Sequence, residues 1–303
     1  MKSIKTIRDV PKEELVKGGA PLCSGCPGSL GLRLALKALG KRTIIINASG
    51  CMTLFTTFPN MPTRVPWLHI AIENAAAGAT GVRAALDQLG RSRGVNILCF
   101  AGDGATYDIG FQALSGAVSR GDDFIFVCYN NNSFSNTGVQ MSSATPYGAY
   151  TSTTPVKEGA GNLMRRKPLA KIIAAHGAPY VAQTCVSNPL DYIKKLQKAA
   201  SIPGPKFIDL LAPCPTGWGF DASKTVEVGE LAVKTGAWPL YEVQDSRFTL
   251  SYSPAKLLPI REYLKTQRRF AGLSEKTVQE IQAQVDKQWA LLRQGRYWEA
   301  EEY

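Results

Sequence analysis

Two short polar motifs place a carboxylate and several amide groups directly after apolar segments. Gly102-Asp103-Gly104 follows the apolar run 96–101, and Asn130-Asn131-Asn132 follows the apolar run 124–129. A helical stretch separates the two runs, which predicts a βαβ unit whose parallel strands end at one sheet edge, where ligands bind. Glycines let backbone N–H groups approach a phosphate, and Mg²⁺ prefers hard oxygen ligands. Each motif alone is ordinary turn sequence, whereas the pair predicts a magnesium diphosphate site.

The residues around these motifs resemble the thiamine diphosphate domain of the pyruvate:ferredoxin oxidoreductases, and in particular that family's separate β subunits. The resemblance spans about residues 18–245 and rests on the segments 102–110, 135–138, 65–67, 73–76, 174–177 and 212–218. It implies a thiamine diphosphate-binding fold and the oxidative decarboxylation of a 2-oxoacid, with pyruvate favoured. Electrons would pass singly through an iron–sulfur cluster to ferredoxin, and the acyl group would pass to coenzyme A.

The same resemblance assigns roles to individual residues. Mg²⁺ would be bound by the Asp103 carboxylate, the Asn131 amide oxygen and the Ser133 backbone carbonyl. Asn136 is the expected catalytic residue, near the substrate and the aminopyrimidine end of the cofactor. The other residues expected at the cofactor are Gly28, Cys51, Gly102, Gly104, Ala105, Asn132, Phe134 and Ser135.

Seven cysteines occur, three in apolar strand-like runs (Cys99, Cys128 and Cys185) and four in Gly- or Pro-rich loops (Cys23, Cys26, Cys51 and Cys214). The first three are expected to be small buried hydrophobic side chains. A Cys-x-x-Cys pair by itself fits a redox dithiol, a zinc half-site or an iron–sulfur half-site. Oxidising a thiamine adduct needs a one-electron acceptor, and zinc has no redox chemistry. The family's cysteine spacing agrees, so the resemblance implies one [4Fe–4S] cluster held by the four loop cysteines.

Apolar periodicity predicts helices and strands that alternate along most of the chain. Helices are expected at about 29–39, 71–88, 107–119, 168–175, 188–200 and 223–236, and strands at 43–47, 96–101, 124–129, 179–185, 206–211 and 239–243. This alternation predicts an α/β fold with a mostly parallel sheet and helices on both faces. Residues 1–253 are expected to form the domain that binds thiamine diphosphate and the cluster. Residues 254–303 are expected to form a helical extension that contacts another subunit.

Composition excludes several other classes of function. The net charge is +11, but the basic residues form short, scattered groups without the aromatic residues of a nucleic-acid groove. No signal peptide and no apolar run of 18 or more residues is present, so we expect a cytoplasmic protein with no membrane partner and no structural disulfides. The aperiodic segment 133–166 follows the Asn motif and is expected to form part of the active-site wall.

Two missing features predict partner subunits. In the family, a Glu from a different domain or subunit activates the thiamine ring, and the local candidate Glu73 suits a structural role better. The Cys run of a two-cluster ferredoxin module is also absent, so electrons would leave through another chain. Three alternatives stay open: the same chemistry on oxalate, 2-oxoglutarate, or a branched or aromatic oxoacid; a thiamine enzyme without redox work, such as a decarboxylase or a transketolase-like half; and a non-catalytic iron–sulfur subunit.

Overall fold

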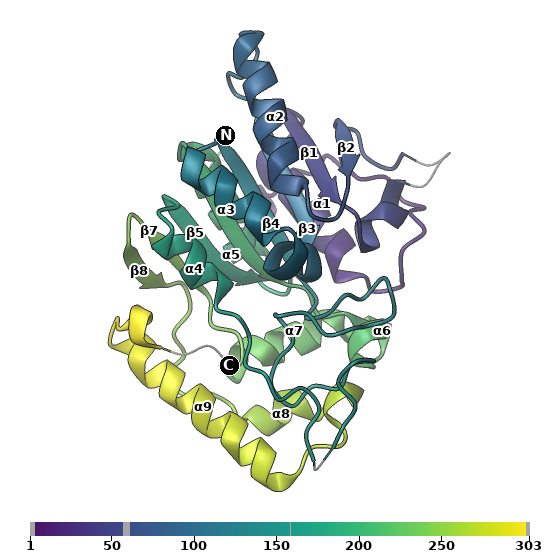
Figure 1. Ribbon diagram of the computed structural model, residues 1–303, viewed down its shortest axis with the longest axis vertical. Coiled ribbons are helices and arrows are strands. Elements are labelled where there is room, and N and C mark those ends of the chain that lie inside the picture. Colours follow the sequence, from purple (N-terminus) through teal and green to yellow (C-terminus); the bar gives the residue numbers. More distant parts are fainter. Residues whose placement is uncertain (1–3, 57–60, 158, 301–303) are drawn as a thin grey trace.

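An eight-stranded sheet forms the centre of the protein in a computed structural model that describes residues 4–56, 61–157 and 159–300 (Figure 1). The strand order is β2-β1-β3-β4-β6-β5-β7-β8. The first six strands in this order pair in parallel, and β7 and β8 pair antiparallel. The strands are β1 (Thr43–Ala48), β2 (Trp67–Ile70), β3 (Asn96–Gly102), β4 (Phe124–Asn130), β5 (Tyr180–Cys185), β6 (Pro205–Leu211), β7 (Tyr241–Gln244) and β8 (Arg247–Leu250). The predicted mostly parallel α/β fold is confirmed.

The central strands are apolar on both sides because helices cover both faces of the sheet. In β3, Ile97 and Cys99 face one core, and Leu98 and Phe100 face the other. The first core lies under α2 (Ala75–Gln88), α3 (Phe111–Arg120) and α4 (Leu169–Ala175), and the second lies under α1 (Pro27–Leu39) and α5 (Pro189–Ser201) (Figure 1).

A third core lies at the carboxyl ends of β5 and β6 and is made mainly of side chains from the later part of the chain. It includes side chains from α6 (Pro215–Trp218), α7 (Thr225–Lys234), α8 (Ile260–Leu264) and α9 (Glu275–Arg293). Figure 1 shows α9, in yellow, along this side of the molecule. Because Ile281, Val285 and Trp289 of α9 are buried in this core, the segment after residue 254 packs firmly on its own chain.

Some predicted element boundaries are wrong. The helix predicted from residue 71 begins at Ala75, because Trp67–Ile70 forms the edge strand β2, which is too short to show a period. The helix predicted from residue 107 begins earlier, as a π-helix over Gly104–Ile109. The last predicted strand, β7, is antiparallel, and β8 was not predicted.

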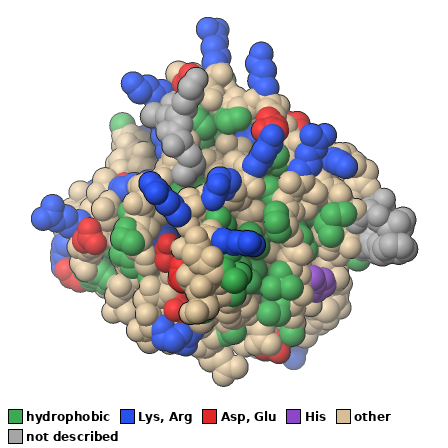
Figure 2. Space-filling model, turned by 90° about the horizontal axis from the view of Figure 1, so that it is seen from above, with side chains coloured by type: hydrophobic (Ala, Val, Ile, Leu, Met, Phe, Trp, Pro, Cys, Tyr) green, Lys and Arg blue, Asp and Glu red, His purple; other side chains and the backbone are tan. Residues whose placement is uncertain are grey.

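The surface agrees with the scattered charge pattern of the sequence. On the face seen from above in Figure 2, the described Lys and Arg side chains stand at separate places. None of the helices in the described ranges is long and apolar enough to cross a membrane.

Candidate active site

Four neighbouring strands each lead within three residues into a predicted site residue. β1 leads to Cys51, β3 to Asp103, β4 to Asn131 and β6 to Cys214. The direction of winding also reverses here, because β1 connects to β2 on one side and β3 connects to β4 on the other. Open α/β sheets bind ligands at the carboxyl ends of strands beside such reversals. The topology therefore brings the two polar motifs and two cysteine segments to one edge of the sheet.

Asp103 is fully buried at the end of β3. The Asn131 N–H donates to its Oδ1 (3.1 Å), and the Ser142 hydroxyl donates to its Oδ2. Burial raises the pKa of Asp103 to about 7, although these hydrogen bonds act to lower it. A buried carboxylate is costly to ionise unless a positive charge faces it, so this position suits a cation ligand.

The Asn131 side chain and the Ser133 carbonyl complete a cluster of polar atoms around Asp103. One terminal atom of the Asn131 amide lies 2.9 Å from Asp103 Oδ1 and 2.8 Å from the Ser133 carbonyl oxygen. If this atom is the amide nitrogen, it donates hydrogen bonds to both oxygens. If it is the amide oxygen, three oxygen atoms lie close together, and a cation among them is needed to offset their repulsion. Octahedral Mg²⁺ with bonds of about 2.1 Å holds neighbouring oxygens about 3.0 Å apart. The separations of the Asn131 terminal atom from the Asp103 and Ser133 oxygens are therefore close to the separation of adjacent ligand atoms around Mg²⁺.

Gly104 and Ala105 line a small cavity of about 50 Å³ beside these polar atoms. They open the π-helix Gly104–Ile109, whose wide turn is closed by a hydrogen bond from Gly110 N–H to the Ala105 carbonyl (2.9 Å). π-turns are rare and frequently mark functional sites. A Cβ at Gly104 would lie 2.3 Å from the Phe134 ring, so glycine is required there. We name this space the glycine cavity.

A larger space of about 210 Å³, the cysteine cavity, is lined by all four loop cysteines. Cys26 precedes α1, and Cys214 precedes α6, where its Sγ accepts a hydrogen bond from Gly217 N–H (3.3 Å). Burial is the main cause that raises the pKa of Cys51 to about 12, and the nearby Cys214 contributes less. A metal would therefore have to displace the thiol proton, because metals bind cysteine as the thiolate.

The placement of the loop cysteines bears on the kind of metal group that they could bind. In the described part of the chain, no three His, Cys, Asp or Glu side chains are placed to share one ion. A [4Fe–4S] cluster attaches each cysteine to a different iron, so its ligands stand farther apart than those of a zinc ion.

The two cavities share a wall formed by Cys51, Tyr129, Asn131, Ser135 and Asn136. The Tyr129 side chain is buried, and glycines pack against it. A Cβ at Gly102 would lie 3.3 Å from its ring, and a Cβ at Gly50 would lie 3.2 Å from its hydroxyl. Asn136 is exposed, so this end of the wall is open to solvent or to another chain. A group in the cysteine cavity would lie one side chain away from a group in the glycine cavity.

The remaining predicted residues lie at different distances from this wall. Gly28 lines the cysteine cavity, whereas Asn132 lines neither cavity, because its side chain bonds to Asn130 and Arg269. The three other cysteines are fully buried, as predicted: Cys99, Cys128 and Cys185. The segment 133–166 contributes Ser142 and residues near its start, but the Tyr147 hydroxyl faces Glu280 instead.

Sequence reasoning missed four residues that shape the site, namely Tyr129, Ser142, Trp218 and Arg269. Tyr129 directly precedes the Asn motif, and Trp218 ends the segment 212–218. Their positions beside these motifs could have indicated that they lie at the site. Ser142 and Arg269 are far from any motif in the sequence.

Comparisons with known proteins agree with this geometry. Residues 48–210 match the family model described as thiamine pyrophosphate enzyme, C-terminal TPP binding domain. Pyruvate synthase subunit PorB of Methanocaldococcus jannaschii is 47% identical over 298 residues, which cover 94% of this chain and 99% of the relative. This chain belongs to the β subunits of the 2-oxoacid:ferredoxin oxidoreductases. The β subunit of the same name from Methanothermobacter marburgensis is 49% identical over 91% of this chain and 96% of the relative.

The family includes β subunits named for different 2-oxoacids. Ketoisovalerate oxidoreductase subunit VorB of Pyrococcus abyssi is 39% identical over 96% of each chain. A structure of 2-oxoglutarate:ferredoxin oxidoreductase from Magnetococcus marinus shares the fold, with a TM-score of 0.58 and 20% identity over 92% of this chain and 99% of that chain. The predicted family and thiamine diphosphate-binding fold are confirmed, and the chain is one subunit of an oxidoreductase that works with other subunits.

Proposed function

We propose that this β subunit holds the diphosphate end of thiamine diphosphate at the glycine cavity, through Mg²⁺ bound at the buried Asp103 beside that cavity, and a [4Fe–4S] cluster in the cysteine cavity, for the oxidative decarboxylation of pyruvate. The observation that carries the proposal is the wall shared by the two cavities. Thiamine diphosphate supplies the carbanion chemistry of decarboxylation, and the cluster accepts electrons singly. Transfer between the two groups would need them close together, and the shared wall at Cys51 and Tyr129 would hold them so.

In this proposal, Asp103, Asn131 and the Ser133 carbonyl bind Mg²⁺, and the backbone at Gly104 and Ala105 approaches the diphosphate. The support is the fully buried Asp103 carboxylate and the 2.8–2.9 Å separations around the Asn131 amide. The Ser142 hydroxyl orients the carboxylate from the side opposite Asn131 N–H.

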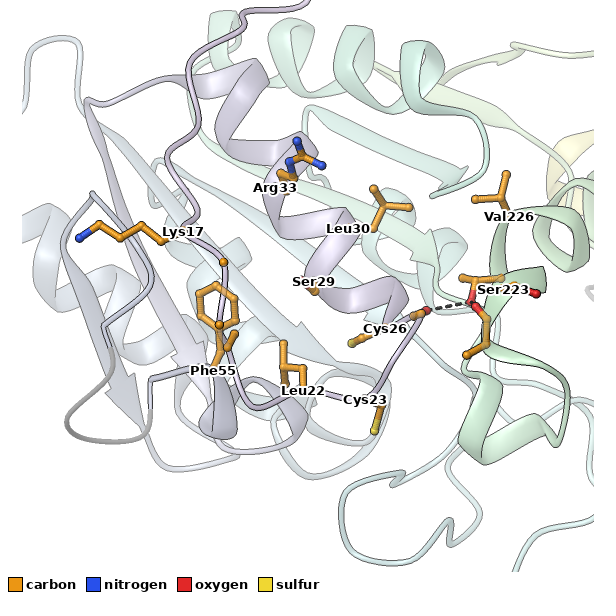
Figure 3. Close-up of a pocket in the computed structure, with 16 residues that line it drawn as sticks. Lys17, Leu22, Cys23, Cys26, Ser29, Leu30, Arg33, Phe55, Ser223 and Val226 are labelled. Atoms are coloured by element: carbon orange, nitrogen blue, oxygen red, sulfur yellow. Dashed lines mark hydrogen bonds between the residues drawn. The ribbon is translucent and has the colours of Figure 1, made fainter.

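Cys23 is exposed, so a cluster bound to it would have one side near the protein surface. Cys23 and Cys26 also line a wider surface cleft of about 460 Å³ between α1 and the start of α7. Figure 3 shows the two cysteines between Leu22 and Ser223, and Arg33 farther along α1. The Thr225 hydroxyl donates to the Gly25 carbonyl (2.8 Å) and fastens the Cys-x-x-Cys turn to α7. We propose that electrons leave through this cleft to a subunit or ferredoxin with its own clusters.

We propose that another subunit supplies the carboxylate that activates the thiamine ring. Within the described residues, no Asp or Glu side chain lines the glycine cavity, and the Asp103 carboxylate is buried beside it. The exposed position of Asn136, at the open end of the shared wall, is where we propose that the ring, the 2-oxoacid and the partner's carboxylate meet. Asn136 would then orient the substrate, and coenzyme A would accept the acyl group.

Pyruvate is proposed as the substrate because the relatives named pyruvate synthase subunits are 47% and 49% identical, against 39% for the ketoisovalerate subunit. The test is dye reduction by the purified complex with a panel of 2-oxoacids, with and without coenzyme A. We expect pyruvate to give the highest kcat/KM and coenzyme A to be required for turnover. Faster dye reduction with another 2-oxoacid would identify that acid as the substrate instead of pyruvate. A colourless, iron-free complex that decarboxylates pyruvate would show that the reaction is not oxidative.

A further inference from the structure

Arg269 reaches from the C-terminal part of the chain into the loop that follows β4. It is only 4% exposed, and its Nη1 donates to the Asn132 side-chain oxygen (3.1 Å). Its Nε donates to Gln267 (2.9 Å), and its Nη2 donates to the Tyr263 hydroxyl (3.3 Å). These contacts fix the guanidinium group in a buried position beside the Asn motif.

The same guanidinium group stacks on Trp218, which contacts the neighbouring residue of the loop. The Arg269 Cζ lies 3.6 Å from the centre of the Trp218 ring, a close cation–π contact. The Trp218 Nε1–H donates to the Asn131 backbone carbonyl (2.7 Å). Trp218 also ends α6, the short helix that begins after Cys214. The stacked pair therefore touches both Asn131 and Asn132 and adjoins the cysteine cavity.

The backbone of the loop is held in an uncommon conformation at Asn132. Its φ is +62°, in the left-handed region, which is uncommon outside glycine although Asn adopts it more readily than most residues. Such residues persist where surrounding contacts determine the conformation. Here the Thr145 hydroxyl donates to the Asn132 carbonyl (2.7 Å), the Asn132 amide donates to Asn130 (2.8 Å), and Arg269 holds its side-chain oxygen.

We propose that Arg269 and Trp218 are positioning residues for the divalent cation site, because they hold the Asn131–Asn132 backbone that aims the Asn131 amide at Asp103 and the Ser133 carbonyl. The inference rests on the proposed function of these three groups as Mg²⁺ ligands. It assigns the segment after residue 254 a part in cofactor binding, although none of its described residues, which run to Ala300, lines the glycine cavity.

The test measures Mn²⁺ binding, by electron paramagnetic resonance of the free ion, to the whole complex freed of divalent metal and supplied with saturating thiamine diphosphate. Arg269→Met keeps apolar bulk over Trp218 and removes the donor to Asn132. We expect its Kd for Mn²⁺ to rise roughly 10- to 100-fold, the usual effect of losing a residue that supports a metal ligand. Arg269→Lys, which keeps a charged donor, should recover part of the affinity. The adjacent exposed residue gives a matched control, Arg268→Met, with unchanged affinity.

A role in packing alone would lower the unfolding temperature of Arg269→Met and leave the Kd of the folded complex within about twofold of the wild type; that result overturns the inference. If Arg269→Met does not fold, Trp218→Phe keeps an aromatic ring under the guanidinium group and removes the donor to Asn131, with a smaller ring in the same place. An unchanged Kd in that variant overturns the inference equally. Absence of Mn²⁺ binding at this chain in the wild-type complex overturns the proposed cofactor site itself and the inference with it.

Discussion

Replacing Asp103 with asparagine should stabilise the metal-free chain and destroy its cofactor site. Asparagine keeps the shape and both hydrogen bonds, because its oxygen accepts the Asn131 N–H and its amide donates to the Ser142 hydroxyl oxygen. It removes a charge that is fully buried. The variant therefore shows how much free energy of folding the buried carboxylate costs when no metal is bound, apart from its role as a metal ligand.

The size of the effect follows from the pKa of Asp103, which burial raises from 3.8 to about 7. Between these two values the folded chain binds more protons than the unfolded chain, so its stability falls as the pH rises and then stays level above about pH 7. At 1.36 kcal/mol per pKa unit, the loss reaches about 4 kcal/mol. Asp103→Asn has no such loss, so the metal-free variant should be more stable than the wild type by about that amount at pH 8 and by little at pH 4.

Mg²⁺ with thiamine diphosphate should cancel this advantage. A ligand present at 1,000 times its Kd stabilises the folded state by about 4 kcal/mol, which offsets the cost of the buried charge in the wild type. The variant should gain nothing from the same additions.

The assay is urea unfolding of the chain, followed by the fluorescence of its 5 tryptophans, at pH 4 to 8 with and without Mg²⁺ and thiamine diphosphate. Asp87→Asn removes an exposed carboxylate of α2, so it is the control, and its free energy of unfolding should stay within about 0.5 kcal/mol of the wild type. A metal-free Asp103→Asn chain that is no more stable than the wild type at pH 8, or that still gains stability from Mg²⁺, would refute this reasoning.

Three further predictions concern the two cavities. Gly104→Ala should lower thiamine diphosphate content severalfold and leave iron content unchanged, because its Cβ would lie 2.3 Å from the Phe134 ring; equal thiamine content by fluorescence assay would contradict this. Tyr129→Phe should shift the midpoint potential of the cluster to more negative values in a redox titration, because a hydroxyl donor beside a cluster stabilises its reduced form; an identical potential would count against it. Ser142→Ala should weaken Mg²⁺ binding at pH 7 by roughly 10-fold in calorimetry, because it removes a hydrogen bond that lowers the pKa of Asp103; unchanged affinity would exclude that role.

Much of the fold could be predicted because the central strands are buried on both faces. Their apolar runs, such as 96–101 and 124–129, are bounded by turn residues and are easy to locate. β2 was missed because its four half-exposed residues show no period, and β8 was missed because it is a short hairpin partner at the sheet edge. The π-helix was read as an ordinary helix, since its wider turn leaves no mark on the apolar pattern.

The site residues that lie next to sequence motifs could also be predicted, whereas the residues that hold them in place could not. Asp103, Asn131 and the loop cysteines stand at strand ends, so topology brings them together. Ser142 and Arg269 reach the site across 39 and 137 residues of sequence, to Asp103 and Asn132 respectively. Such contacts depend on the packing of the long segment and of the third core, which a single sequence does not encode as a local pattern.

The proposed [4Fe–4S] cluster in the cysteine cavity, beside the thiamine site, can be tested by iron and sulfide analysis together with the paramagnetic resonance spectrum of the reduced complex, for the wild type and Cys214→Ser. Cys214→Ser should lose or convert one cluster per chain, with up to about four irons fewer, while its thiamine diphosphate content is kept. Cys185→Ser, at a buried position outside the cavity, should keep both. Unchanged iron and an unchanged spectrum in Cys214→Ser would mean that Cys214 holds no cluster.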